Sequence, residues 1–354
     1  MKKAKRVLIA VVVILLVIVL TMFINVYFCF LHHYTGKYVN NPWKEDDIFE
    51  INKITTLEKK KDKDFVILNL ADVQMCDLEN FFDKRKLHNE LTYLVKTYKP
   101  DLITLTGDQT WSNENLICLT SLISWLDEYH IPYAPIFGNH DHGNKFSSAT
   151  AGLNYCCQLY EEGKYSLFNR GPTNIDSLGN YVINIKEEDR IINTLYMMDL
   201  GYNDEINESQ LKWFKWNAEG IKENNNNICP YGICFTHKEL PQYKKAYQYY
   251  LNVDPSIAEG RVTVHMGFDH VKETGFAALS QSYNVKDYVC GHEHYNNFTL
   301  NYQGARYTFT LKTGEFGGCY KDDSIYLNGA TIIRLNNEKP VIEHQLVNRD
   351  IWKR

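Results

Sequence analysis

Positive charge is scarce relative to negative charge in this sequence of 354 residues. The 38 Lys and Arg residues are outnumbered by 43 Asp and Glu residues, which gives a formal net charge of −5. A protein that binds nucleic acid uses a basic surface to neutralise the backbone phosphates. Because the sequence has no such excess, nucleic acid is not expected as a partner.

Cysteine pairs of the zinc-binding type are also absent. The nine cysteines are an odd number and form no C-x-x-C pair, which argues against a zinc knuckle. Buried free thiols are the expected state, with a disulfide between Cys229 and Cys234 as the alternative. The 25 Tyr residues do not recur at a fixed period, so the chain is not expected to be a repeat protein.

A long apolar run is present at the N-terminus, from Val7 to Phe30, and it carries no formal charge. It is long enough to cross a bilayer as a helix, and the basic flank from Lys2 to Arg6 is expected to stay in the cytoplasm. No small-x-small cleavage site follows, so an uncleaved signal-anchor is preferred to a cleaved signal peptide. Residues 1–31 are therefore expected to hold a single-pass protein in the cell membrane, with the domain that follows on the extracytoplasmic side.

Residues 32–64 are polar and include the charge run EKKKDKD at positions 58–64, which predicts a solvated spacer. The folded domain is expected to cover residues 65–354, where short apolar runs alternate with helical patterns, as in an α/β domain with buried strands. The predicted helices cover residues 84–98, 116–129 and 208–223. The predicted strands cover residues 65–70, 102–106, 133–137, 231–235, 287–290 and 307–311.

Potential metal ligands follow each of the first five predicted strands. Ligand sites in such sheets lie beyond the carboxyl ends of the strands, so we expect these side chains to converge on one rim. In chain order they are Asp72 and Gln74, Asp108, Asn139 with His140 and Asp141, His237, and His292 with His294.

This set of residues suits the hydrolysis of a phosphate ester. That reaction needs a strong nucleophile and positive charge at the phosphoryl oxygens, and two metal ions about 3.5–4 Å apart supply both. Asp108 is the candidate for the carboxylate that bridges the ions, because Gly107 before it allows a sharp turn at the strand end. Mixed carboxylate, amide and imidazole ligands favour Mn, Fe, Zn or Co over Ca.

In the order and type of these motifs, from about Phe65 to Tyr320, the chain resembles the calcineurin-like metallophosphoesterase superfamily. Three further stretches are similar to its purple-acid-phosphatase-like branch: THKELPQY at 236–243, VKDYVCGHEHYNNF at 285–298 and KTGEFGGCY at 312–320. The resemblance implies an α/β fold in which a two-sheet sandwich is flanked by helices and a dinuclear metal site lies at one edge.

The resemblance also implies a role for each candidate residue. One divalent ion would be held by Asp72, Gln74, Asp108 and His294, and the other by Asp108, Asn139, His237 and His292. His140 would face the substrate, and Asp141 would orient its imidazole. Metal-bound hydroxide would then attack the phosphorus of a phosphomonoester or a small phosphodiester, without a covalent enzyme intermediate.

Two positions depart from the family pattern. Gln74 stands where His is commonest, and because an amide is a weaker donor than imidazole, we expect lower affinity for the first ion. Trp111 stands where purple acid phosphatases have an iron-binding Tyr, so neither a tyrosinate-to-iron colour nor an obligatory ferric ion is expected. Gln74 also leaves an alternative open, a catalytically inactive surface module that binds a phosphorylated ligand.

The remaining polar residues near the motifs carry weaker expectations. His142, His265 and His270 are expected to be structural or exposed, with substrate contact as the alternative. Lys238 and Tyr320 are candidates for phosphate binding only because they lie near the motifs. The segments 142–180 and 241–282 contain no motif that identifies the substrate.

Overall fold

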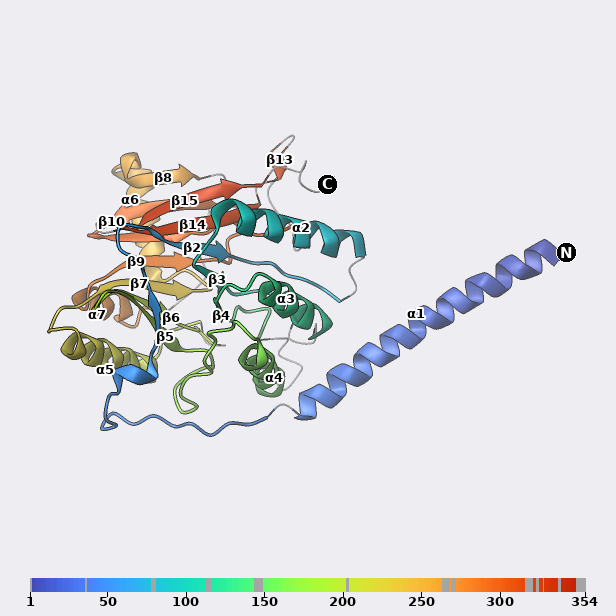
Figure 1. Cartoon of the computed structure of the whole chain (residues 1–354). Helices are drawn as coiled ribbons and strands as arrows, with labels where there is room; N and C mark the ends of the chain where they lie inside the picture. Colours follow the sequence, from blue (N-terminus) through green and yellow to red (C-terminus); the bar gives the residue numbers. More distant parts are fainter. Residues whose placement is uncertain are drawn as a thin grey trace.

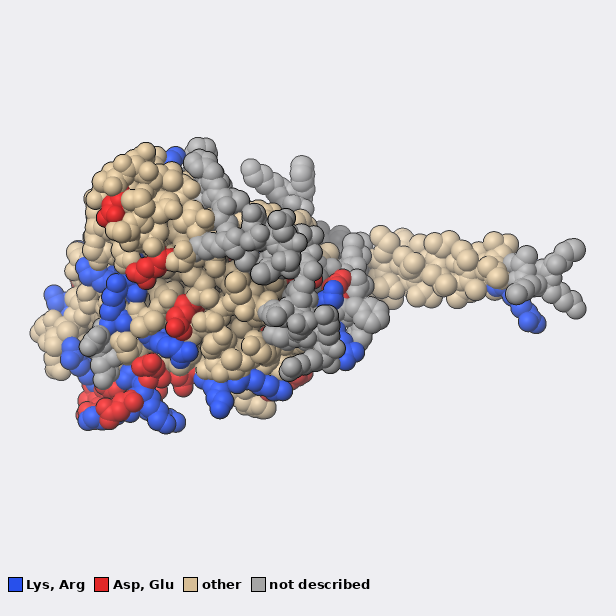
Figure 2. Space-filling view, turned by 90° about the horizontal axis from the view of Figure 1, so that it is seen from above, with Lys and Arg blue, Asp and Glu red and all other residues tan. Residues whose placement is uncertain are grey.

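The computed structural model of the chain describes residues 2–35, 37–77, 81–112, 116–142, 149–201, 204–262, 268, 272–315, 321–322, 325–326, 328–336 and 339–347. A long helix, α1 (Lys2–Thr35), projects from one side of a folded domain (Figure 1). Its segment Lys5–Ile24, with a mean hydropathy of 3.6, is long and apolar enough to cross a membrane. A signal sequence near an N-terminus has the same properties, so the topology stays a prediction. Figure 2 shows an uncharged surface along the described part of α1 except near its N-terminal end, and interspersed charges on the domain.

The domain contains a five-stranded sheet with the order β15-β14-β2-β3-β4. Its strands β2 (Phe65–Leu70), β3 (Leu102–Thr106) and β4 (Tyr133–Ile136) are parallel. Of the other two, β14 (Gly329–Leu335) pairs in antiparallel fashion with β2, and β15 (Val341–Leu346) pairs in antiparallel fashion with β14. Every residue of β2 is buried, which explains why its sequence FVILNL is almost continuously apolar.

A second, eight-stranded sheet has the order β1-β5-β6-β7-β9-β11-β10-β8. Its strands are β1 (Thr55–Glu58), β5 (Tyr181–Glu187), β6 (Arg190–Met197), β7 (Tyr231–Thr236), β9 (Val285–Cys290), β11 (Ala305–Phe309), β10 (Asn297–Tyr302) and β8 (Ala258–Arg261). The run β6, β7, β9 and β11 is parallel. A separate two-stranded ribbon joins β12 (Lys321–Asp322) and β13 (Ile325–Tyr326).

Helices cover the outer faces of the two sheets. The helices α2 (Phe81–Tyr98), α3 (Leu116–Glu128) and α4 (Ala149–Glu162) pack on the five-stranded side, and α5 (Glu208–Asn224), α6 (Pro241–Asn252) and α7 (Phe276–Ser282) pack on the eight-stranded side. Two short 3-10 helices span Ile51–Lys53 and Pro255–Ile257. In β6, Leu195 and Met197 belong to the core between the sheets, whereas Tyr196 belongs to the core under the second group of helices. This alternation is the period-2 pattern of a strand buried on both faces, and the predicted two-sheet α/β sandwich flanked by helices is confirmed.

Seven cysteines with described side chains are free thiols, and most of them are buried. Cys229 and Cys234 are both free. The expected state is therefore the observed one, and the alternative disulfide between these two residues is not formed.

Residues 37–58, here called the strap, differ from the expected solvated spacer because they run along the domain. Trp43 donates from its backbone N–H to Asn174 Oδ1 at 2.8 Å, and its carbonyl accepts from Asn174 Nδ2 at 2.7 Å. Further along, β1 pairs in parallel with β5. The sequence suggested a solvated spacer because of the charge run at 58–64. The strap is held instead by a few separate apolar and backbone contacts, whose residues show no helix or strand periodicity in the sequence. Folded structure therefore extends N-terminal to Phe65.

Phe49 provides the most specific apolar contact of the strap. Its ring lies 5.0 Å from that of Trp216, centroid to centroid, in an edge-on arrangement. It also sits against Gly220 of α5, where a Cβ atom would lie 2.2 Å from the Phe49 ring. A glycine inside a helix normally costs stability, so its presence here is explained by the space that Phe49 needs.

Because of this contact, we expect the substitution Gly220→Ala to change stability in the opposite direction from the usual one. In a helix interior the change normally stabilises by about 1 kcal/mol, but here it should displace Phe49 and lower the melting temperature of the full-length protein in detergent. In a Phe49→Ala background the same change should raise the melting temperature. Thermal unfolding of the four proteins measures both effects, and a rise in both backgrounds would show that the strap is not docked.

Candidate metal centre

The candidate site lies where the carboxyl ends of strands from both sheets meet. Asp72 and Asp108 follow β2 and β3 of the five-stranded sheet, whereas His237 follows β7 of the eight-stranded sheet. These three buried side chains each place one potential ligand atom within 4.8 Å of the others. The expected convergence of strand ends is therefore present, and it is formed by two sheets rather than one.

The backbone around the site is held in an uncommon conformation. Four candidate ligands have positive φ values, of 52°, 50°, 51° and 67°, and these are Asp72, Gln74, Asp108 and His292. Such left-handed conformations are uncommon for residues with a side chain and cluster at functional sites. Gly107 and Gly138 provide the remaining space, because a Cβ atom would lie 2.5 Å from His237 Nδ1 at the first and 2.2 Å from Asp108 Oδ1 at the second.

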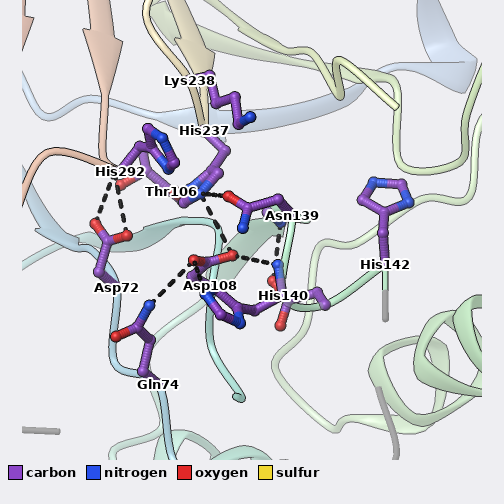
Figure 3. Close-up of polar contacts among 12 residues, drawn as sticks. Asp72, Gln74, Thr106, Asp108, Asn139, His140, His142, His237, Lys238 and His292 are labelled. Carbon is purple, nitrogen blue, oxygen red and sulfur yellow. Dashed lines mark hydrogen bonds and ion pairs between the residues drawn. The ribbon is translucent and has the colours of Figure 1, made fainter. Parts of the chain in front are cut away.

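The hydrogen bonds of His237 show where a cation would bind (Figure 3). Its Nδ1 lies 2.9 Å from the carbonyl oxygen of Thr106, and because a carbonyl only accepts, Nδ1 carries the proton. Its Nε2 lies 3.0 Å from Asn139 Oδ1 and 3.3 Å from Asp108 Oδ1. A neutral imidazole would direct a lone pair at two oxygen acceptors, so either a proton or a metal ion is needed between them. The donor set of this half of the site fits a metal ion.

The other half of the site is built around Asp72. Both of its carboxylate oxygens accept from the backbone N–H of His292, at 2.9 and 3.1 Å, and Oδ1 lies 3.4 Å from His294 Nε2. Gln74 donates from Nε2 to Asp108 Oδ2 at 3.2 Å. Its Oε1 is buried and has no hydrogen-bond partner among the described residues, and a buried amide oxygen without a partner suits a hard cation.

The electrostatics of the site are dominated by its buried carboxylates. Burial favours raised pKa values for Asp72 and Asp108, but the neighbouring histidines lower the pKa of both, His294 mainly for Asp72 and His237 for Asp108. Burial also favours a lower pKa for His237, but the charge of Asp108 outweighs it and raises the pKa to about 10. The site thus attracts positive charge strongly, as a metal centre must.

Among the described residues, no hydrogen bond joins Asp141 to the imidazole of His140, contrary to the expectation. The Nδ1 atom of His140 donates to the backbone carbonyl of Trp111 at 2.9 Å. Asp141 accepts instead from backbone N–H groups, at 2.9 Å from Gly138 and 3.1 Å from Thr110. The prediction that Asp141 orients the imidazole directly is therefore corrected, because adjacent side chains in this turn point in different directions. Burial, followed by the charge of Asp108, raises the pKa of Asp141 to about 7.

Two of the five secondary candidates, His142 and Lys238, belong to the described residues, and both are held by carboxylates. His142 is buried and its Nε2 lies 2.9 Å from Asp199 Oδ2, which supports the structural interpretation. Lys238 donates to Asp204 Oδ2 at 3.1 Å. His265, His270 and Tyr320 lie outside the described residues.

Sequence reasoning missed two buried residues that support the backbone around Asp72, Lys312 and Glu90. Lys312 is buried and donates from Nζ to the backbone carbonyl of Asp72. Nearby, Glu90 of α2 accepts from the N–H of Gly314 at 3.1 Å and from Asn328 Nδ2 at 2.8 Å. Burial raises the pKa of Glu90 to about 7. Lys312 could have been found from the sequence, because it begins the family-like stretch KTGEFGGCY. No motif in the sequence points to Glu90.

Comparisons with known proteins agree with this geometry. The family model for calcineurin-like phosphoesterases matches residues 65–296. A relative from Arabidopsis thaliana, named probable inactive purple acid phosphatase 28, is 23% identical over 243 residues, or 62% of this chain and 59% of the relative. The chain therefore spans about three fifths of the length of that relative.

Two solved structures are also similar. A dimetal phosphatase from Danio rerio is 12% identical, with a TM-score of 0.44 over 79% of this chain and 99% of its own. A purple acid phosphatase from yellow lupin (Lupinus luteus) seeds is 12% identical, with a TM-score of 0.46 over 77% of this chain and 49% of its own. The name of the plant relative agrees with the predicted branch, and its description as inactive leaves catalysis to be tested.

The raised pKa of His237 predicts proton release when metal binds. At pH 7 the chelated protein should hold His237 as imidazolium, since its pKa is about 10, and a metal ion binds only the neutral imidazole. Binding should release about one proton per chain from this residue, and affinity should fall as the pH is lowered. Calorimetric titration in buffers of different ionisation enthalpy measures the release. The variant His237→Ala should release about one proton fewer, and equal release by both proteins would contradict the assignment.

Proposed function

The chain belongs to the calcineurin-like phosphoesterase family, and from this premise we propose that it is a metal-dependent enzyme that hydrolyses a phosphomonoester or a small phosphodiester. The observation that supports the proposal most directly is that His237 Nε2 points at two oxygen acceptors, 3.0 and 3.3 Å away, beside two buried carboxylates. This arrangement is stable only with positive charge at its centre.

In this proposal, two divalent ions are held by seven side chains. Asp72, Gln74, Asp108 and His294 would hold one ion, and Asp108, Asn139, His237 and His292 would hold the other. Mn, Fe, Zn or Co suits the mixture of carboxylate, amide and imidazole donors. The chemistry that such a pair of ions supplies is activation of water and neutralisation of the phosphoryl oxygens.

The protein's own groups orient the substrate and supply a proton. His140 is held through Nδ1 by the Trp111 carbonyl, and its Nε2 lies 3.8 Å from Asp108 Oδ2, at the edge of the centre. In the imidazolium form of the ring Nε2 also carries a proton, which would pass to the leaving oxygen of the ester and leave a neutral imidazole protonated at Nδ1. Asp141 would position His140 indirectly. Its carboxylate links the backbone of Thr110, next to Trp111, to that of Gly138.

The proposed location follows from α1. Residues 1–31 would form the cytoplasmic flank and the signal-anchor in the lipid bilayer, and the catalytic domain from residue 65 onward would lie on the extracytoplasmic side. The docked strap would hold the domain close to its anchor, because it takes up most of the chain that would otherwise serve as a flexible tether.

A second candidate is an inactive module that binds a phosphorylated ligand at the same surface. The description of the plant relative as inactive favours it, as does Gln74 in place of a stronger ligand. His140 argues against it, because a module that only binds phosphate has no need of a proton donor at the leaving-group side.

The enzymatic proposal is tested by Asp108→Asn, which removes the charge of the proposed bridging ligand. Hydrolysis of a chromogenic phosphomonoester and phosphodiester by the full-length protein, with Mn, Zn, Fe or Co added back after chelation, should fall by about a thousand-fold or more. The matched control is Asp62→Asn, at an exposed turn outside the site, which should keep full activity. An unchanged rate in Asp108→Asn would sink the proposal.

Metal content separates the two candidates. The enzyme should bind two ions per chain at saturation, as counted by elemental analysis after equilibrium dialysis. Fewer than two ions, together with no turnover on either ester, would favour the binding module over the enzyme.

A further inference from the structure

Among the tryptophans that the structure describes, Trp111 is the most exposed, at 47%. It lies in the loop that follows β3, three residues after Asp108, and so at the mouth of the candidate centre. Large aromatic rings are normally placed where their apolar surface is covered. An exposed indole beside a polar site therefore calls for an explanation.

The backbone around Trp111 is held firmly in place. Its N–H donates to the carbonyl of Met75 at 2.9 Å, and Met75 forms an isolated bridge with Thr110. Thr110 in turn donates from its backbone N–H to Asp141 Oδ1 at 3.1 Å. The exposed ring is thus carried by a loop tied to two other strand ends, and its position is set before any ligand arrives.

One side of the Trp111 ring is already used by the proposed proton donor. The indole and the imidazole of His140 lie 4.6 Å apart, centroid to centroid, at an interplanar angle of 31°. The backbone carbonyl of the same Trp111 accepts the hydrogen bond from His140 Nδ1 at 2.9 Å. The remaining exposed surface of the indole therefore lies directly beside the group that would protonate the leaving oxygen.

We propose that Trp111 is the platform on which the organic group of the substrate stacks. The inference rests on the proposed function, because it takes this organic group to be the leaving group of the ester. The substrate class is then a phosphate joined to a flat aromatic group, such as an aryl group or a nucleobase-bearing group. With the phosphate at the metal ligands, the group bonded to the ester oxygen beside His140 meets the indole. Stacking on tryptophan is tolerant of ring type because every flat ring has a π-face.

The test compares two ligands that differ in flatness but not in charge. Benzylphosphonate and cyclohexylmethylphosphonate have similar size, and neither is hydrolysed. Their dissociation constants are measured by calorimetry with the full-length, Mn-loaded protein. Wild type should bind the benzyl compound more tightly by about two- to twelve-fold, the range expected for one aromatic pair.

Matched variants isolate the ring. Trp111→Leu should abolish the preference and Trp111→Phe should retain part of it, whereas Tyr93→Leu, which removes an exposed aromatic side chain on α2, should leave it unchanged. The hydrogen bond to His140 uses the backbone carbonyl, so all Trp111 variants keep it. An equal ratio in wild type and Trp111→Leu, or no preference in wild type, would overturn the platform.

Hydrolysis of benzyl phosphate and cyclohexylmethyl phosphate, measured alongside, separates this inference from the proposed function. These esters have similar leaving-group basicity, so their ratio of kcat/KM reports the same stacking. Phosphonate binding with the expected ratio but no hydrolysis would overturn the enzymatic proposal alone. Hydrolysis with the same ratio in wild type and Trp111→Leu would overturn the platform alone, and failure of both phosphonates to bind would overturn both.

Discussion

Two buried carboxylates, Asp72 and Asp108, impose the constraint on which the rest of the site depends. A carboxylate removed from water is costly unless positive charge and hydrogen-bond donors surround it. Here Asp72 is compensated by the imidazole of His294 and the backbone N–H of His292. Asp108 is compensated by the imidazole of His237 and the backbone N–H of His140. A pair of cations would complete the balance, and the surrounding structure is arranged so that all these groups meet.

The sandwich architecture makes this meeting geometrically feasible. Asp72 and Asp108 come from one sheet and His237 and His292 from the other, so the packing of the two sheets determines how far apart the candidate ligands lie. Positive φ values at strand ends turn the side chains toward one another, and Gly107 leaves room for the ring of His237. Strain of this kind persists only where the surroundings hold it, and buried support such as Lys312 beneath Asp72 supplies that hold.

Much of the fold could be predicted from local patterns. The runs at 65–70 and 102–106 correspond to β2 and β3, because a strand buried on both faces is continuously apolar. The helix over 208–223 corresponds to α5, which also has a capping box at Asn207. The strap was missed because Trp43 and Phe49 are isolated apolar residues in polar sequence, and only tertiary contacts, such as those of both rings with Trp216, show that they are docked.

The sequence by itself determined the chemistry available: which ligand types are present, in what order, and at which strand ends. It did not determine where individual atoms point. The tertiary structure decided that Thr106 holds the proton of His237 across 131 residues of chain, and that a carbonyl rather than the Asp141 carboxylate orients His140. The physical reason is that hydrogen-bond direction and close packing depend on groups brought together by folding, whereas residue type and local period are carried by neighbours in the chain.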